Sequence, residues 1–372
     1  FKNLGYNLMG FDQYYTCDGK KFYNIFKAFD HFKQKEDFVQ YVIDKDFVLS
    51  LQNIKKPKNL STQYVKNLMV STLKSLRTKH QRIRLAFSGG TDSWTILKLC
   101  VQNDIFIDQV VCQLNSFTNN PRSNIEYLPG INYAKKQVGK TIGELVLNPM
   151  TTNALKFFDD TEWYKKTFGP FIPMRTAILQ KYLKDMDDKN YITISGLEKP
   201  TLYVENKKIY WTNLDEKCFG EFMGFENHYP FFYSKNNPEL TVAITYLFLD
   251  NAPKSLFTNK SIVEYERINN VKTKKNILSL LGKTVDRPWI NYHKLKSKSH
   301  ANSIKTRYFF KELQQQRLGH YIEKNFKSME HLYSKYKNIP YSVIMEDKWT
   351  KSVGRFSQKI QINADRFGKS DR

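Results

Sequence analysis

One short segment constrains the fold of this chain more than any other. Residues 83–87 are mostly apolar, and Ser-Gly-Gly-Thr-Asp-Ser follows at 88–93, before a helical pattern that extends to about residue 101. A buried strand, a glycine turn and a helix in direct succession are typical of one βα unit of a parallel sheet. We therefore expect an α/β fold with this turn at the carboxyl edge of the sheet, where such proteins bind ligands.

The same alternation continues beyond this unit. It predicts strands at about 109–114 and 191–195, an apolar run at 142–147, and helices at about 131–138 and 175–186. Strands that alternate with helices at this spacing favour βαβ units and a doubly wound parallel sheet.

We expect three regions in the chain: an N-terminal α+β extension over 1–80, a ligand-binding α/β domain over 81–252, and a basic, mostly helical region over 253–372. The first contains a turn dipeptide, Asp18-Gly19, and an amphipathic helix over 61–80. The last contains 26 Lys and Arg against 10 Asp and Glu, a net charge of +16 out of +23 for the whole chain. Such a region fits either a solvated helical surface or a nucleic-acid partner, tRNA or DNA.

Cysteine usage and hydropathy exclude several classes of protein. The four cysteines (Cys17, Cys100, Cys112 and Cys218) form no C-x-x-C pair, which argues against a disulfide framework, a zinc ribbon or a Cys-ligated cluster. Histidines 228, 293, 300 and 320 have no metal-binding spacing. No apolar run approaches the roughly 18 residues that span a bilayer, and the first residues do not have the pattern of a secretory signal. We expect a soluble cytoplasmic protein without a membrane partner.

The turn at 88–93 has the composition of an anion-binding site. Gly89 and Gly90 allow a tight turn and bring backbone N–H groups close to a ligand, and the helix that starts near Ser93 points its positive dipole end at the same place. Asp92 beside an anion is explained by a Mg²⁺ ion that bridges to phosphates, or by helix capping. Hydroxyl donors come from Ser88, Thr91 and Ser93. A glycine-rich turn that only caps a helix is the alternative.

The segment Phe87-Ser88-Gly89-Gly90-Thr91-Asp92-Ser93 resembles the pyrophosphate loop, SGG-x-DS, of the PP-loop ATP pyrophosphatases, the adenine nucleotide alpha-hydrolase-like superfamily. The order of strands and helices over roughly 82–200 resembles the nucleotide-binding half of that superfamily, and the chain is similar in look to phage asparagine synthase-like proteins. The resemblance implies a sheet of the HUP type that binds ATP and Mg²⁺. It also implies that ATP is split to AMP and pyrophosphate, and that an acidic or carbonyl-containing acceptor is activated as an adenylate. A Walker loop and a Rossmann G-x-G-x-x-G are both absent from the sequence, so γ-phosphoryl transfer and dinucleotide redox chemistry are not expected.

From the residues and this resemblance together, we expect catalytic roles for Ser88, Asp92 and Lys199, and Mg²⁺ ligands in Asp92 and Glu198. The expected ATP-binding residues are Phe87, Ser88, Gly89, Gly90, Thr91, Asp92, Ser93, Leu114, Arg175 and Gly196. Glu198 and Lys199 equally fit a surface turn that ends at Pro200, and Arg175 equally fits a solvated helix N-terminus.

Departures from the family narrow the expected activity. Asparagine synthetases carry a glutaminase domain with an N-terminal catalytic cysteine, whereas the first cysteine here is Cys17, so ammonia would come from elsewhere. Cys100 and Cys112 lie in apolar stretches and are expected to be buried, which makes sulfur transfer less favoured. We expect an adenylate-forming enzyme that makes an amide or other C–N bond, in the host cytoplasm if the chain is phage-encoded. The alternatives are an enzyme of the same chemistry that modifies a tRNA or DNA base, and a non-catalytic binding protein with a nucleotide fold. The oligomeric state does not follow from the sequence.

Overall fold

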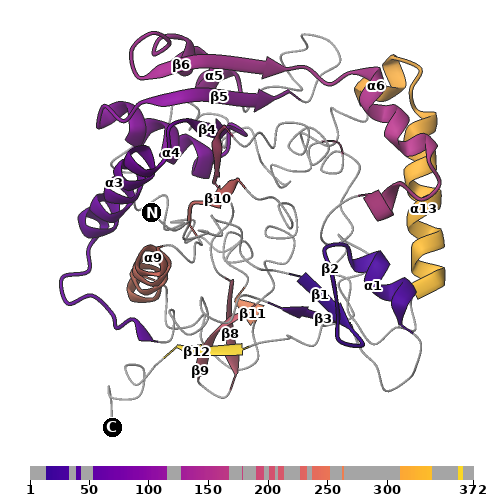
Figure 1. Cartoon of the computed structure of the whole chain (residues 1–372), viewed down its shortest axis with the longest axis horizontal. Helices are drawn as coiled ribbons and strands as arrows, with labels where there is room; N and C mark the ends of the chain where they lie inside the picture. The colour runs from indigo at the N-terminus through magenta and orange to yellow at the C-terminus, as the bar shows by residue number, and fades with distance from the viewer. Residues whose placement is uncertain are drawn as a thin grey trace, which may run out of the picture.

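A five-stranded parallel sheet organises the computed structural model of this protein (Figure 1). The structure describes residues 14–32, 39–42, 53–114, 127–166, 178, 190–196, 201–205, 208–212, 227–232, 237–251, 262–263, 311–336 and 359–362. The sheet contains β4 (Ile83–Ala86), β5 (Ile107–Gln113), β6 (Ile142–Asn148), β7 (Ile192–Ser195) and β10 (His228–Pro230). All four neighbouring pairs are parallel.

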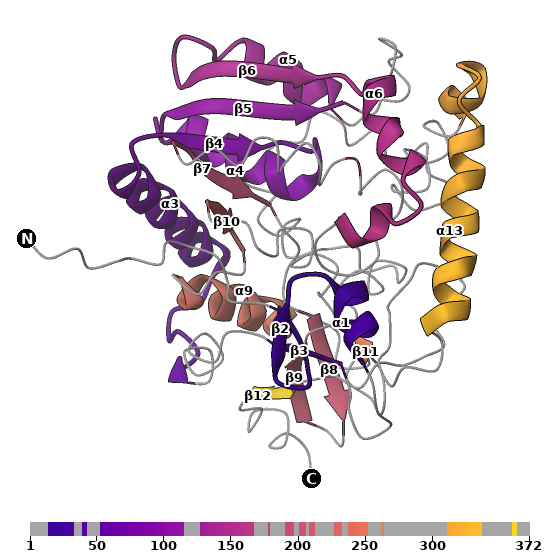
Figure 2. The ribbon, with the colours of Figure 1, turned by 45° about the vertical axis from the view of Figure 1, so that its right-hand side comes forward.

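The strand order explains where a ligand would bind. Read across the sheet, the strands follow one another as β6, β5, β4, β7 and β10, which is also their sequence from top to bottom in Figure 2. After β4, the chain adds β5 and then β6 on one side of β4. It then crosses back and adds β7 and β10 on the other side. Loops diverge at such a reversal and leave a crevice outside the carboxyl ends of the two strands. The predicted α/β fold with a parallel sheet is thus confirmed, and the strand order reverses between β4 and β7, which is consistent with a doubly wound fold.

Helices connect the strands much as the sequence pattern predicts. The helix α4 (Thr91–Gln102) joins β4 to β5, and α5 (Leu128–Lys135) precedes β6. Trp94, Ile96 and Leu97 of α4 are at most 1 % exposed, so this helix lies inside the core rather than at the surface. A second core helix is α9 (Pro238–Asn251), which packs against α3 (Thr62–Lys79).

The helix α3 forms because an apolar stripe and a cap coincide. Its N-cap Ser61 accepts a hydrogen bond at its side-chain oxygen from the N–H of Tyr64, at 3.1 Å. Val65, Met69 and Leu73 recur at helical spacing and are buried. The helix predicted over 61–80 is therefore confirmed to within one residue at each end.

The N-terminal region contains a hairpin at the predicted Asp18-Gly19 turn, followed by a short helix. The strands β1 (Tyr14–Cys17), β2 (Lys20–Phe22) and β3 (Gln40–Val42) form a small antiparallel sheet, and the helix α1 (Ile25–His31) follows β2. Asp18 and Gly19 both have positive φ, +48° and +68°, as a two-residue turn between right-twisted strands requires.

A third sheet brings distant parts of the chain together. A hairpin is formed by β8 (Thr201–Glu205) and β9 (Lys208–Thr212), and two further strands flank it: β11 (Ile262–Val263) and β12 (Lys359–Ile362). Strand pairing thus connects segments on both sides of residue 252, where we expected a boundary. Of the predicted helix over 175–186 only Ile178 is described, in helical conformation.

The helix α13 (His320–Tyr336) fits the helical character predicted for the C-terminal region. Lys324 of this helix forms an ion pair with Asp159, in the 3₁₀ turn Lys156–Asp159, and Lys335 forms one with Asp30 of α1 at 2.8 Å. That turn follows the short helix α6 (Thr152–Leu155) and precedes another 3₁₀ turn, Trp163–Lys166. In the part of the chain that the structure describes, no helix is long and apolar enough to cross a bilayer.

Candidate functional site

The segment after β4 adopts the predicted strand, turn and helix. Phe87 continues the sheet for one residue because its N–H donates to the carbonyl oxygen of Val111 at 2.8 Å. Gly89 then has φ +71°, a left-handed conformation that only glycine adopts without strain. Gly90 is the N-cap residue of α4, and no side chain caps the helix. The loop therefore brings the positive end of α4 to the carboxyl edge of the sheet.

Two serine hydroxyls form hydrogen bonds within this loop. The Oγ of Ser93 accepts a hydrogen bond from the N–H of Ser88 at 3.2 Å and donates to the carbonyl oxygen of Gly90 at 3.3 Å. The Oγ of Ser88 accepts from the N–H of Gly90 at 3.3 Å and lies 3.2 Å from the Oγ of Ser93. Ser93 is 2 % exposed, whereas Ser88 is exposed. Ser93 thus shapes the loop, and Ser88 is the serine that solvent or a ligand can reach.

The aromatic residue before the loop belongs to the core. Phe87 is 2 % exposed, and its ring centroid lies 6.1 Å from that of Trp94. A Cβ placed on Gly130 of α5 would lie 2.2 Å from the ring of Phe87, so the absence of a side chain at 130 lets α5 approach this close. The side chain of Phe87 therefore supports the loop from below and does not face a ligand.

Gly196 brings the end of β7 against the start of α4. A Cβ at this position would lie 2.6 Å from the backbone nitrogen of Ser93 and 2.8 Å from the carbonyl carbon of Asp92. Contacts below 3.0 Å are not tolerated between a Cβ and backbone atoms, so only glycine fits here. Gly196 and the 88–93 loop are therefore side by side at the reversal of strand order between β4 and β7.

The structure places the other predicted ATP and metal residues as follows. Asp92 is half-buried in the first turn of α4, and Leu114 is half-buried at the end of β5, where its N–H donates to the carbonyl oxygen of Asn148 at 2.8 Å. The side chain of Thr91, and the whole of Arg175, Glu198 and Lys199, lie outside the described residues. Among the residues that are described, no group of three or more His, Cys, Asp or Glu side chains is placed to hold a metal ion. Of the two expected Mg²⁺ ligands, the structure thus describes Asp92 but not Glu198.

A buried serine–histidine pair lies directly before Gly196, and the sequence pattern did not reveal it. The Oγ of Ser195 and the Nε2 of His228 are 2.6 Å apart, and both residues are 5 % exposed. Burial lowers the pKa of His228 to about 3, so the ring is neutral at physiological pH. The contact joins β10 to β7 at Ser195, the residue directly before Gly196.

This pair predicts a stability that depends on pH. His228 is protonated near its usual pKa of 6.5 in the unfolded chain and only near pH 3 in the folded chain. The contribution of the neutral ring to the free energy of unfolding is therefore complete above pH 6.5 and is lost as the pH falls towards 3. Between pH 7.5 and pH 5 we expect the wild type to lose about 2 kcal/mol more of its unfolding free energy than His228→Gln does. Urea unfolding at both values measures this difference. The variant His320→Gln, at an exposed position, should behave as the wild type, and equal pH dependence in wild type and His228→Gln would contradict the assignment.

The described cysteines are buried, as predicted for two of them. Cys17, Cys100 and Cys112 are at most 2 % exposed, and burial raises the pKa of the Cys100 and Cys112 thiols to about 12. Such thiols are not nucleophilic at neutral pH. Cys218 lies outside the described residues.

No family model matches the chain, and no curated protein matches it in sequence.

Proposed function

We propose that this chain is an ATP-dependent enzyme of the PP-loop type, with a sheet of the HUP type, that splits ATP into AMP and pyrophosphate. Its product would be an adenylated acceptor on which an amide or another C–N bond is then formed. The similarity of Ser88-Gly89-Gly90-Thr91-Asp92-Ser93 to the SGG-x-DS loop suggests this chemistry, and the geometry described above supports it.

One observation carries the proposal: the loop and Gly196 meet at the reversal of strand order. A nucleotide loop needs backbone close to the phosphates, a left-handed glycine and a helix N-terminus in one place. Here Gly89 has φ +71°, α4 begins at Thr91, and Gly196 leaves no side chain beside the first helical turn. Gly196 thus lets the end of β7 lie directly against the turn that would bind the phosphates.

The residues at the loop fit ATP with a magnesium ion. The backbone at 88–93 and the exposed hydroxyl of Ser88 would bind the β- and γ-phosphates, and the carboxylate of Asp92 offers the hard oxygen ligand that Mg²⁺ prefers. When bound, Mg²⁺ supplies charge neutralisation between the phosphate oxygens. Lys199 would contact a phosphate and Glu198 would add a second carboxylate.

In the proposed reaction, an oxygen of the acceptor attacks the α-phosphorus of ATP. The bond from that phosphorus to the oxygen that bridges to the β-phosphate breaks, and its electron pair leaves with pyrophosphate. The 88–93 backbone then acts by stabilising the negative charge of this leaving group. A nitrogen nucleophile next attacks the activated carbon, AMP leaves with the former acceptor oxygen, and the nitrogen gives up a proton.

A second candidate is the same chemistry on a base of tRNA or DNA. The net charge of +23 favours it, because a polyanionic substrate is attracted by such an excess of cations. Sulfur transfer fits less well, since the Cys100 and Cys112 thiols are buried with raised pKa values. A non-catalytic nucleotide-binding protein is the third alternative, and turnover separates it from the other two.

The products of ATP turnover test the proposal. Purified protein is incubated with Mg²⁺ and ATP labelled at the α-phosphate, with and without bulk tRNA or DNA; labelled AMP and ADP are separated, and the unlabelled pyrophosphate is quantified in the same samples. We expect AMP and equimolar pyrophosphate. Stimulation by a nucleic acid would identify the class of acceptor. Release of ADP would contradict attack at the α-phosphate, and ATP binding without turnover in any mixture would favour the non-catalytic alternative.

A further inference from the structure

The helix α3 carries an excess of positive charge that its own stability does not need. It has no Asp or Glu in 18 residues but contains Lys66, Lys74, Arg77 and Lys79. Cations in the last helical turn stabilise the helix dipole, which accounts for Arg77 and Lys79. Lys66 and Lys74 lie outside that turn, so the dipole gives no reason for them.

Only one of these cations has an acidic partner among the described residues. Arg77 forms an ion pair with Asp108, whereas no described carboxylate lies within ion-pair distance of Lys66 or Lys74. The nearby His80 reflects this positive environment: its pKa is lowered by burial, and further by the charges of Lys79 and Arg77. Among the residues that the structure describes, the charges of Lys66 and Lys74 on α3 are thus not paired with a carboxylate.

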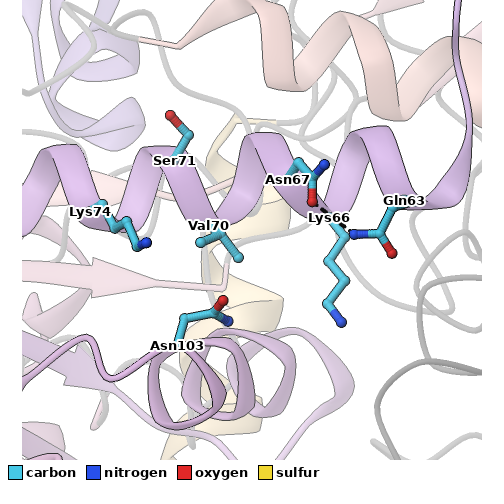
Figure 3. Close-up of a pocket in the computed structure, with 7 residues that line it drawn as sticks. All are labelled: Gln63, Lys66, Asn67, Val70, Ser71, Lys74 and Asn103. Atoms are coloured by element: carbon cyan, nitrogen blue, oxygen red, sulfur yellow. Dashed lines mark hydrogen bonds between the residues drawn. The ribbon is translucent and has the colours of Figure 1, made fainter.

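These two lysines line a groove between α3 and the end of α4. The groove has a volume of about 390 Å³ and is drawn in Figure 3. Besides the two lysines, its polar lining consists of Gln63, Asn67, Ser71 and Asn103. No carboxylate is among the described residues that line it, and Gln63 donates from its Nε2 to the Oδ1 of Asn67 at 2.8 Å. Ammonium, amide and hydroxyl groups together are the donors that proteins present to phosphate oxygens.

We propose that this groove binds the phosphodiester backbone of a nucleic acid. Lys66 and Lys74 are eight residues apart on one helix, or about 12 Å along its axis, a separation that suits two different phosphates of a polymer better than one small anion. A membrane surface fits less well, since the large apolar side chains that are exposed in the described structure (Tyr23, Phe106, Leu128 and Val138) all lie outside α3.

The groove acts at a distance from the ATP loop. Asn103 follows the last residue of α4, and the loop precedes the first, so the two ends are about 18 Å apart along the 12-residue helix. Contacts between the groove and the phosphodiester backbone of a nucleic acid therefore lie far from the loop that would bind ATP. They affect the affinity of the protein for nucleic acid and not the rate of ATP cleavage. The inference concerns binding alone and goes beyond the proposed reaction.

Direct binding tests this proposal without requiring turnover. The full chain is titrated into a fluorescein-labelled 25-base-pair DNA duplex and into a single-stranded RNA of equal length, at several salt concentrations, with anisotropy as the readout. We expect the double variant Lys66→Gln/Lys74→Gln to bind roughly tenfold more weakly at 0.1 M salt, and to lower the slope of log affinity against log salt by about two for the duplex. The matched control, Lys136→Gln/Lys140→Gln, removes the same charge from exposed positions that follow the C-terminal end of α5. It should change the affinity for either probe less than about twofold.

Three outcomes would overturn the inference. The first is wild-type protein that binds neither probe at 50 mM salt, and the second is an equal loss of affinity in both double variants. The third is displacement of the duplex by inorganic phosphate at constant ionic strength, which would indicate a small-anion site. Formation of AMP from ATP alone is measured on the same proteins and should be equal in wild type and Lys66→Gln/Lys74→Gln. Failure of wild-type protein to form AMP would count against the proposed function and would leave the binding result standing.

Discussion

Replacing Gly196 with alanine is expected to lower the rate of AMP formation from ATP by at least about 100-fold. The added methyl carbon would lie 2.6 Å from the backbone nitrogen of Ser93 and 2.8 Å from the carbonyl carbon of Asp92. Neither is the end of a flexible side chain, so β7 and the first turn of α4 must separate. A shift of even 1 Å would move the 88–93 backbone away from the phosphates that it is proposed to bind.

Single-turnover formation of labelled AMP measures this effect, and thermal unfolding shows whether the variant is folded. Gly319→Ala is the matched control, because a Cβ there would make only an ordinary contact of 3.7 Å with the side chain of Gln314. We expect this control to keep wild-type turnover. A folded Gly196→Ala protein with wild-type turnover would show that the approach of β7 to α4 does not matter for catalysis.

The elements around this site could be predicted from the sequence because their signals are local. The strand expected over 83–87 is observed at Ile83–Ala86, and the one expected over 109–114 at Ile107–Gln113. The helix expected from Ser93 begins two residues earlier, at Thr91. Thr91, Asp92 and Ser93 are residue types that often cap helices, which is why the sequence pattern placed the start too late. Gly90 is the N-cap instead, and the hydroxyl of Ser93 donates to the carbonyl oxygen of Gly90.

The strand order could not be predicted in the same way. Local periodicity indicates βαβ units, but which strands are neighbours depends on contacts between distant segments, such as the pairing of Ala86 with Ser195. The resemblance to PP-loop enzymes indicated a glycine beside the nucleotide, and the contact of Gly196 with Asp92 and Ser93 gives that expectation a physical basis.

Other features of the site lacked any sequence signal. His228 lies on a three-residue strand, too short to show a period, and its partner Ser195 is 33 residues away. For α3, the sequence pattern indicated only an amphipathic helix over 61–80 and gave no special role to its lysines. Their convergence with Asn103 depends on how α3 crosses the end of α4, which no local pattern encodes.

Asp92→Asn is expected to reduce AMP formation by about 100-fold or more, on the scale of losing one electrostatic contact in a preorganised site. Asparagine has nearly the same shape and keeps an oxygen acceptor, so the substitution removes the charge and leaves the packing beside Gly196 unchanged. The metal role further predicts that the residual activity responds to Mg²⁺ only at higher concentration. Quantification of AMP across a magnesium titration measures both effects.

The alternative role for Asp92 predicts a different result. A carboxylate in the first turn of α4 also stabilises the helix dipole, and loss of that charge would cost about 0.3–1 kcal/mol of unfolding free energy. Asp104→Asn is the matched control: it removes the same charge from an exposed position just after α4, where φ is +53° and asparagine is well tolerated. If Asp92→Asn lost only this much stability and turned over ATP as fast as Asp104→Asn does, Asp92 would be a helix-stabilising residue, and the proposed magnesium site would have to be formed by other ligands.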